Sequence, residues 1–244
     1  MIELQGPGDS SFDPRSLDAP VVIAAFEGWN DAADAASAVI DHLLKVWDAR
    51  IIGAIDPEEF YDFQVNRPTV GTDDHGFRRL TWPSTQIAVA SPPDLDRDVI
   101  LIRGIEPNMR WRQFCAELLA ACDDLGGELV VTLGALLADT PHTRPIPVTG
   151  TATEPDLVDR LKLEQSTYEG PTGIVGVFQD ACVRLDVPAV SYWAAVPHYV
   201  AHASWRSEDW PPASSFARAL RAMAGPAASA SMHPGLPQPQ RGPR

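Results

Sequence analysis

The sequence predicts an α/β domain built around a mostly parallel sheet, and two observations carry this prediction. Residues 21–25 (VVIAA) form an apolar run bounded by Pro20 and Gly28, which is typical of a strand buried on both faces. Apolar residues then recur at helical spacing, at Ala32, Ala36, Val39, Ile40, Leu43, Leu44 and Trp47. A buried strand, a polar turn and a helix form the opening unit of an α/β domain, and we expect Asn30 or Asp31 to cap the helix.

Strands and helices continue to alternate along the rest of the chain. We expect further strands at residues 49–55, 77–82, 86–90, 98–103, 129–133, 145–149 and 188–194. The segments 77–82 and 86–90 are expected to form a hairpin across Pro83 and Ser84. Helices are expected at residues 57–63, 110–125, 154–163 and 174–185. Residues 66–76 read as a long, polar, flexible loop.

The length of 244 residues suits one α/β domain with a small C-terminal helical appendage. We expect residues 1–19 to form an extended lead-in, 20–205 the α/β domain and 206–225 a C-terminal helix. Residues 226–244 are rich in Ala, Ser, Pro, Gln and Gly, so they are expected to be disordered.

The overall charge limits the classes of partner. The formal net charge is −14, and binding to phosphates requires clustered Lys and Arg, so neither nucleic acid nor an anionic membrane is expected as a main partner. The N-terminus lacks the pattern of a signal peptide, and no apolar run reaches membrane-spanning length. We therefore expect a cytoplasmic protein. Cys115, Cys122 and Cys182 read as small core residues rather than a disulfide framework.

Polar residues gather where the expected strands end, on what should be one edge of the sheet. Most candidate ligand- or partner-binding residues lie in these strand-end turns, and two lie in the Gly/Pro turn at 168–173. They are Glu27, Asn30, Asp31, Arg103, Glu106, Asn108, Arg110, Trp111, Asp139, Thr140, His142, Arg144, Glu169, Thr172 and His198. Arg103, Arg110 and Arg144 could clamp an anion, and Glu27 or Asp139 could act as a general base. The alternative is that these groups form structural ion pairs and hydrogen bonds, which is the commoner outcome for strand-end charges and lone histidines.

Motifs that would dictate a reaction are absent from the sequence. There is no metal-ligand spacing, no P-loop and no nucleophile elbow, so we expect no metal, no cofactor and no catalytic residue of these types. Trp29, Trp82, Trp111 and Trp193 lie beside polar turns. Because Trp and Arg together are typical of interface anchors, these turns are candidates for subunit contacts.

Four of these turns together resemble the PAC2 family, in its actinobacterial branch. They are residues 27–32 (EGWNDA), 106–111 (EPNMRW), 133–144 (LGALLADTPHTR) and 168–174 (YEGPTGI), and the similarity runs from about residue 20 to residue 199. Members of this family are related to proteasome assembly chaperones. The resemblance implies a three-layer α/β/α sandwich of the phosphorylase or hydrolase type, a homo-oligomer with a trimer as one option, and proteasome α subunits as partners.

The resemblance leaves two hypotheses for the function. One is an oligomeric scaffold or chaperone-like binding protein, related to proteasome assembly and without catalytic activity. It would not dock by its tail, because the chain ends Gly242-Pro243-Arg244 where relatives that dock in this way have a hydrophobic residue, Tyr and one more residue. The other is an enzyme or small-molecule binder, with a nucleoside, phosphate ester or amino-acid-like anion in a strand-end cleft. Convergence of the charged candidates on one closed pocket would favour the second hypothesis, and pairing among them would favour the first.

Overall fold

A computed structural model describes residues 2–4, 13 and 16–200 of the chain. Its centre is an eight-stranded sheet in the order β1-β3-β6-β7-β2-β8-β10-β9. Four neighbouring strands of this sheet run parallel: β2 (Val21–Glu27), β7 (Val99–Ile105), β8 (Leu129–Ala138) and β10 (Ala189–Pro197). The remaining strands pair antiparallel: β1 (Ile2–Leu4), β3 (Arg50–Ile55), β6 (Gln86–Ala90) and β9 (Val148–Ala152).

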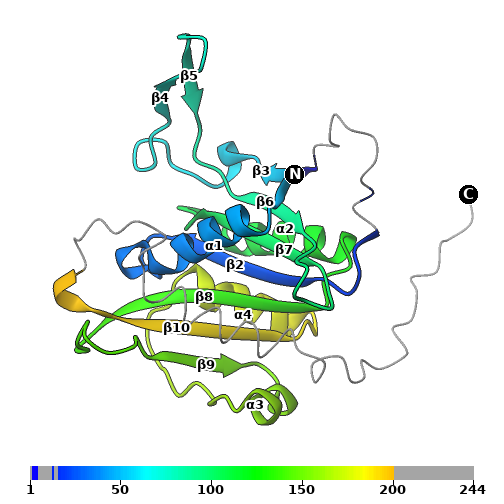
Figure 1. The fold of residues 1–244 in the computed structure, drawn as a ribbon, viewed down its shortest axis with the longest axis vertical. Helices are drawn as coiled ribbons and strands as arrows, with labels where there is room; N and C mark the ends of the chain where they lie inside the picture. The colour runs from blue at the N-terminus through cyan, green and yellow to red at the C-terminus, as the bar shows by residue number, and fades with distance from the viewer. Residues whose placement is uncertain (1, 5–12, 14–15, 201–244) are drawn as a thin grey trace, which may run out of the picture.

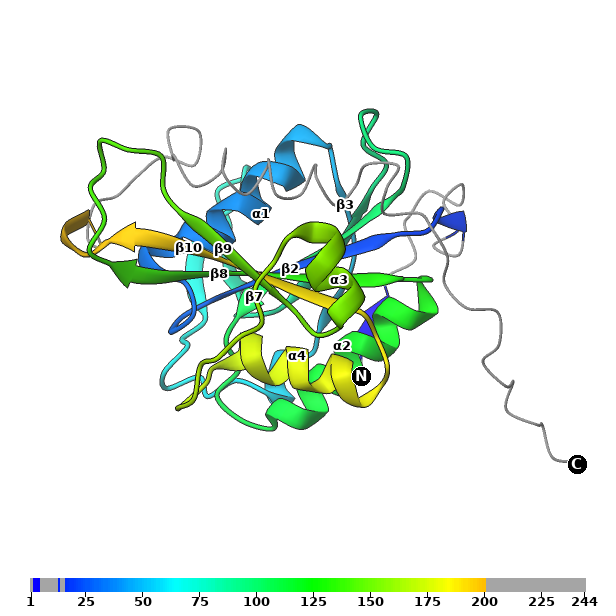
Figure 2. The same cartoon turned by 90° about the horizontal axis from the view of Figure 1, so that it is seen from below.

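Helices cover both faces of this sheet, so the predicted three-layer α/β/α sandwich is confirmed (Figures 1 and 2). One face carries α1 (Ala35–Val46), and the other carries α2 (Trp111–Asp124) and α4 (Ile174–Arg184), which lie against each other. The short helix α3 (Pro155–Leu161) packs beside β9 at the sheet edge. Three single turns of 3-10 helix complete the described fold: η2 (Ala32–Asp34), η3 (Pro57–Glu59) and η4 (His198–Val200).

Strand β2 is the centre of the molecule because its alternate side chains enter two separate cores. Val21, Ile23 and Ala25 face the core that α1 covers, where the buried Ala35 and Ala36 bring the helix close to the sheet. The intervening side chains of β2 face the core beneath α2 and α4. An apolar run with no polar alternation is therefore what a strand covered on both faces requires.

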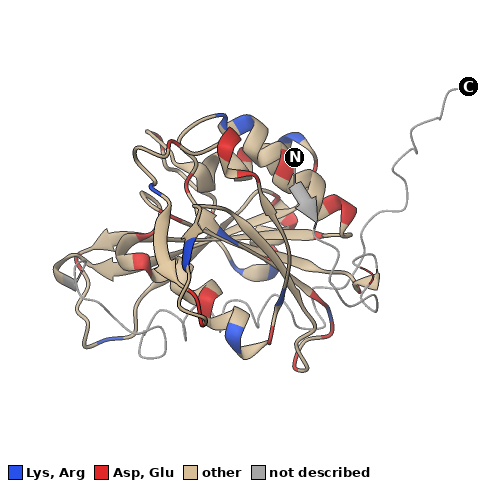
Figure 3. Cartoon of the chain, turned by 90° about the horizontal axis from the view of Figure 1, so that it is seen from above, with Lys and Arg blue, Asp and Glu red and all other residues tan. Residues whose placement is uncertain are grey.

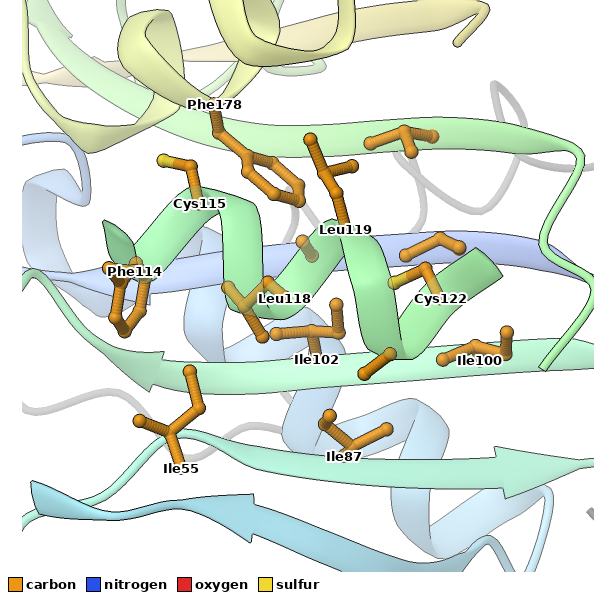
Figure 4. Close-up of a cluster of buried hydrophobic side chains, with 14 of the residues drawn as sticks. Ile55, Ile87, Ile100, Ile102, Phe114, Cys115, Leu118, Leu119, Cys122 and Phe178 are labelled. Atoms are coloured by element: carbon orange, nitrogen blue, oxygen red, sulfur yellow. The ribbon is translucent and has the colours of Figure 1, made fainter. Parts of the chain in front are cut away.

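The core beneath α2 and α4 is built from aromatic and branched side chains (Figure 4). Phe114 of α2 meets Phe26 and Phe60 edge-to-face, with ring centroids 5.8 and 5.4 Å apart. Cys115 and Cys122 lie on the same buried face of α2, as predicted, and Cys182 is buried with them. Burial raises the pKa of each of these thiols to about 12, so they remain protonated and unreactive core residues.

One part of the predicted topology is wrong. Segments 77–82 and 86–90 do not pair with each other. Strand β5 (Arg78–Thr81) instead pairs antiparallel with β4 (Thr69–Thr72), which lies inside the segment predicted as a loop. Strand β6 joins the main sheet between β3 and β7, because its buried Ile87, Ala88 and Val89 can be covered only there. The polar run at 73–76 is the turn of the β4/β5 hairpin.

Smaller differences concern the ends of elements. The helix predicted at 57–63 is reduced to the single turn η3, at which the Asp56 carboxylate accepts a hydrogen bond from the backbone N–H of Glu58. Strand β8 continues to Ala138 because it keeps its parallel partner β10 over that whole length. Strand β1, within the predicted lead-in, pairs with β3. The predicted C-terminal helix and disordered tail lie beyond residue 200, outside the described residues.

Candidate functional site

The candidate residues lie along the carboxyl edge of the parallel strands. Because β7, β2, β8 and β10 run parallel, the turns that follow them meet at one edge, where open α/β sheets bind ligands. The structure divides the candidates into four groups: a strand-end cluster of paired side chains, a set that fixes the following loops, an outer set at the ends of β8 and β10, and an exposed pair in the turn before α4. We define the strand-end cluster as Glu27, Asn30, Asp31, Asp41, Arg103 and Glu106.

Arg103 is held between two carboxylates. Its Nη2 lies 2.6 Å from Oε1 of Glu27 and 3.1 Å from Oδ2 of Asp41, and its Nε lies 2.5 Å from Oδ1 of Asp41. Burial by itself would lower the pKa of Arg103, but the hydrogen bond and charge of Asp41, aided by Glu27, outweigh burial and raise it. All three groups are partly buried, so this is a closed set of ion pairs rather than an arginine free to bind an anion.

Asn30 and Glu106 join the first turn of the site to the start of α4. Asn30 is 2% exposed, and its Nδ2 donates to Oε1 of Glu106 at 2.8 Å. The same oxygen accepts from the backbone N–H of Ile174 at 2.8 Å, so the Glu106 carboxylate caps α4 from another part of the chain. Gly173 makes this approach possible, because a Cβ there would lie 2.4 Å from Nδ2 of Asn30. The Oδ1 atom of Asn30 is buried and has no hydrogen-bond partner within the described residues.

Asp31 caps α1 from outside the helix. Its carboxylate accepts from the backbone N–H groups of Ala36 at 2.6 Å and Ser37 at 3.2 Å, which confirms the predicted capping role. The chain reaches this arrangement through η2, where Ala33 and Asp34 have positive φ angles of 54° and 55°. Burial raises the pKa of Asp31 to about 6, against the opposing effect of these hydrogen bonds.

The second motif mainly fixes the loop that follows β3. Asn108 accepts through Oδ1 from the backbone N–H of Asp62 and from Nδ2 of Asn66, both at 2.8 Å. Arg110 forms an exposed ion pair with Glu59. The Nε1 of Trp111 donates to the carbonyl of Pro107 at 2.6 Å, and the ring packs against the core.

The outer candidates lie away from the strand-end cluster. Strand β8 pairs with β2 only as far as Leu133, and beyond that point it continues beside β10 to Ala138. Figure 1 shows the ends of these two strands projecting from one side of the body. The predicted residues at the ends of β8 and β10 are Asp139, Thr140, His142, Arg144 and His198. They are therefore separated from the predicted residues that follow β2 and β7.

Tyr199 organises this outer group. Its hydroxyl accepts from the backbone N–H of His142 at 2.8 Å and lies 3.0 Å from Nδ1 of the same residue. Thr140 donates to the carbonyl of Ala195 at 3.1 Å. Asp139, Arg144 and His198 are not joined to the strand-end cluster by any hydrogen bond or ion pair within the described residues.

The fourth motif contributes backbone geometry more than side chains. Glu169 and Thr172 are exposed. Thr172 does not cap α4, because Gly173 occupies the N-cap position and the capping oxygen comes from Glu106. A side chain at the cap position would collide with Asn30, and so the cap has to come from a distant residue.

Sequence reasoning missed one residue of the strand-end cluster and one groove on the surface. Asp41 lies on α1, seven residues beyond the turn, and only the three-dimensional contact with Arg103 identifies it. An open groove of about 340 Å³ lies elsewhere, at the base of the β4/β5 hairpin, with Val65, Arg67, Trp82 and Ile105 among its lining residues. None of the predicted site residues lines it.

Within residues 2–4, 13 and 16–200, no group of three His, Cys, Asp or Glu side chains is arranged to hold a metal ion. None of the helices described there has the length and apolar character needed to span a bilayer.

Comparison with known proteins identifies the family of the chain. A profile described as the PAC2 family matches residues 25–229. A PAC2 family protein from Streptomyces avermitilis is 54% identical, with a TM-score of 0.77, over 83% of this chain and 84% of that one. A proteasome-assembly chaperone homologue from Mycobacterium tuberculosis is 53% identical, with a TM-score of 0.72, over the same shares.

More distant similarity extends to archaea. An archaeal proteasome activator from Pyrococcus furiosus has 14% identity and a TM-score of 0.66, over 92% of this chain and 88% of that one, so it shares the fold. A search of curated proteins gave no match. The family profile covers most of the chain and agrees with the four turns that meet around the sheet, and the protein therefore belongs to the PAC2 family.

Proposed function

We propose that the protein is a homo-oligomeric, chaperone-like binding protein that takes part in proteasome assembly in the cytoplasm and has no catalytic activity at the strand-end cluster. The observation that carries this proposal is that the charged groups of the cluster pair with one another. Arg103 is paired with Glu27 and Asp41, and Glu106 is held by Asn30 and α4. Groups neutralised in this way stabilise a scaffold and are poorly placed to bind or activate a substrate.

The relatives support a partner connected with the proteasome. The M. tuberculosis protein described as a proteasome-assembly chaperone homologue shares 53% of its residues with this chain in the aligned region. We extend its described role to this protein as a hypothesis, because the two chains share their fold and more than half of their aligned residues.

The exposed apolar residues support a binding role. Trp29 is 67% exposed at the first turn, and Leu136 and Leu137 are 45% and 52% exposed near the end of β8. The backbone N–H of Ala135, next to these leucines, donates to the carbonyl of Asn30 at 2.8 Å, which ties the Trp29 turn to β8. Exposed aromatic and aliphatic residues at rigid turns are typical anchors of protein interfaces.

Capture of proteasome α subunits tests the proposal. The purified chain should retain 20S α subunits from the same organism, and Trp29→Ala combined with Leu137→Ser should reduce capture at least fivefold, roughly as expected for loss of a hot spot. Val183→Ser with Leu185→Ser is the matched control, because both residues are similarly exposed on or next to the distant end of α4. Absence of α-subunit enrichment by the native chain would remove the proteasome from the proposal.

A small-molecule site is the second candidate, and one atom favours it. Oδ1 of Asn30 is buried without a partner beside Glu106 and the start of α4, and it could accept a hydrogen bond from a neutral donor such as a nucleoside. An anion is disfavoured there, because the carboxylate of Glu106 already occupies the N-terminus of α4. A nucleoside that raises the melting temperature of the native chain but not of Asn30→Ala would favour this candidate over the first.

A further inference from the structure

The β4/β5 hairpin is a separate two-stranded sheet that projects from the body (Figure 1). Its turn is well ordered, because the Asp73 carboxylate accepts from the backbone N–H groups of His75 at 3.0 Å and Phe77 at 2.8 Å. Gly76, with a φ of 82°, completes the turn. Every residue of β4 and β5 is exposed, so the hairpin has a defined shape but no covering element within the described residues.

The hairpin presents apolar side chains to solvent. Val70 and Leu80 are cross-strand partners, so they lie on the same face, and they are 53% and 54% exposed. Phe77 at the turn is 70% exposed, and Trp82 at the base is 45% exposed beside the open groove. An isolated two-stranded hairpin is marginally stable in water, so the exposed pair of Val70 and Leu80 and the exposed aromatic rings at its two ends are best explained by a partner that covers them.

The charge of the hairpin is opposite to that of the rest of the chain. Arg67, Arg78 and Arg79 outnumber Asp73 and Asp74, although the whole chain has a formal net charge of −14. None of the three arginines forms an ion pair with another described residue. The surface that fits this arm is therefore acidic.

An acidic surface of this kind lies at the opposite edge of the sheet. Asp94 and Asp96 are exposed in the loop between β6 and β7, and Asp123 and Asp124 are exposed at the end of α2. The ion pair between Arg97 and Glu128 at 3.9 Å brings this loop beside the segment that follows α2. Figure 3 shows acidic positions on the helices and loops of the body.

The position of these acids is locally unfavourable. The last turn of α2 has Asp123 and Asp124 and no basic residue, so two negative charges add to the negative end of the helix dipole. Among the described residues, no basic side chain forms an ion pair with either of these two carboxylates. A cationic group from outside would stabilise this edge.

We propose that the hairpin, residues 67–82, is an arm that docks on the acidic amino edge of a second copy of the chain. The arm leaves the carboxyl edge after β3, whereas its complement lies at the amino edge, so the contact is head-to-tail, and it generates a ring if the rotation between subunits closes and a filament if it does not. This inference deepens the homo-oligomeric part of the proposed function and rests on it. The second copy is the occupant because the complementary charge is on the chain itself.

Charge reversal with rescue tests the arm. The mass of the purified full chain is measured by sedimentation equilibrium over a range of concentrations. Arg78→Glu with Arg79→Glu, and separately Asp94→Lys with Asp96→Lys, should each raise the subunit dissociation constant at least tenfold, roughly as expected when like charges meet in an interface. An equimolar mixture of the two variants should reach a higher average mass than either variant alone at the same total concentration, because the reversed arm of one variant then meets the reversed edge of the other.

Two controls make the result specific. Asp156→Lys with Asp159→Lys changes the net charge by the same amount as Asp94→Lys with Asp96→Lys, but on exposed residues of α3. This variant should keep the mass of the native assembly. Far-ultraviolet circular dichroism verifies that each variant is folded. A native chain that remains a single subunit at 100 μM or more (a value on the order of weak oligomer dissociation constants) overturns the proposal, as does a mixture whose mass does not exceed that of the separate variants. The assay contains no proteasome subunit, so its outcome is independent of the capture experiment above.

Discussion

The strand-end cluster and the β4/β5 hairpin contain similar kinds of residue but use them in opposite ways. In the cluster, each charged group faces a partner from another element, and the polar atoms lie in or near the core. In the hairpin, arginines and apolar side chains face solvent, and the strands pair only with each other. The charged side chains of the cluster are therefore joined to one another, while the exposed apolar and basic side chains without a described partner lie further out.

The largest difference between the two regions should appear when one carboxylate is removed. Glu106→Ala leaves Nδ2 of Asn30 and the N–H of Ile174 without their acceptor, and the free energy of unfolding should fall by about 3 kcal/mol. Urea denaturation measures this loss. Glu106→Gln, which keeps an acceptor oxygen, should recover at least half of it. A loss below about 1 kcal/mol would mean that the cluster does not hold α4.

Close packing offers a second contrast. A methyl group at Gly173 would lie 2.4 Å from Nδ2 and 2.5 Å from Oδ1 of Asn30, so Gly173→Ala should destabilise the fold by about 2 kcal/mol. Gly71 in the hairpin has no atom within 4 Å of an added Cβ, and Gly71→Ala should change stability by less than about 0.5 kcal/mol. Thermal unfolding of the two variants compares them directly, and equal shifts in melting temperature would contradict the contrast.

Titration of Asp31 should make the stability of the inner region depend on pH. The pKa of this carboxyl is about 6 in the folded chain and near 3.8 when unfolded, so the folded state binds the extra proton between these values. Stability from this group is therefore fully present below the unfolded pKa and is lost as the pH rises through 6. Relative to pH 7.5, Asp31 should add about 1 kcal/mol at pH 5. Asp31→Asn should remove that increment from urea unfolding curves, and an unchanged pH dependence would exclude Asp31 as its source.

The smallest effect is expected at an exposed ion pair. Glu59→Ala removes the partner of Arg110, but both side chains are well exposed, so the free energy of unfolding should change by less than about 0.5 kcal/mol. Glu106→Ala is the comparison. Urea denaturation of both variants under identical conditions shows which substitution lowers the free energy of unfolding more. A larger loss at Glu59 than at Glu106 would reverse the distinction between buried and exposed charges.

The sequence predicts the core of this fold well because the relevant signals are local. The run at 21–25 has no polar residue, and only a strand covered on both faces accommodates it, as β2 shows. The helical spacing of Phe114, Leu118 and Cys122 likewise marks the buried face of α2. The grouping of the strand-end turns at one edge follows from the parallel order of the strands.

The pairing in the hairpin was predicted wrongly because one of its strands lacks that signal. Strand β5 lies within the strand predicted at 77–82, but Thr69–Thr72 has no buried face, so no alternation of apolar and polar residues identifies it as the partner of β5. The pairing of Arg103 with Asp41, and of Glu106 with the start of α4, depends on contacts between distant segments. Residue type alone identifies these groups as charged and placed at a strand end, but it does not identify their partners.

The independence of the hairpin has an evolutionary consequence. Thr69 and Thr81 face each other at its base, and the strands above them make no substantial contact with another element. Residue pairs could therefore be added to or deleted from the arm without altering the sheet of the body. Since each added pair lengthens the arm by about 3.3 Å, such changes would adjust the spacing between neighbouring subunits. Related chains could then differ in subunit number while keeping the same α/β/α core.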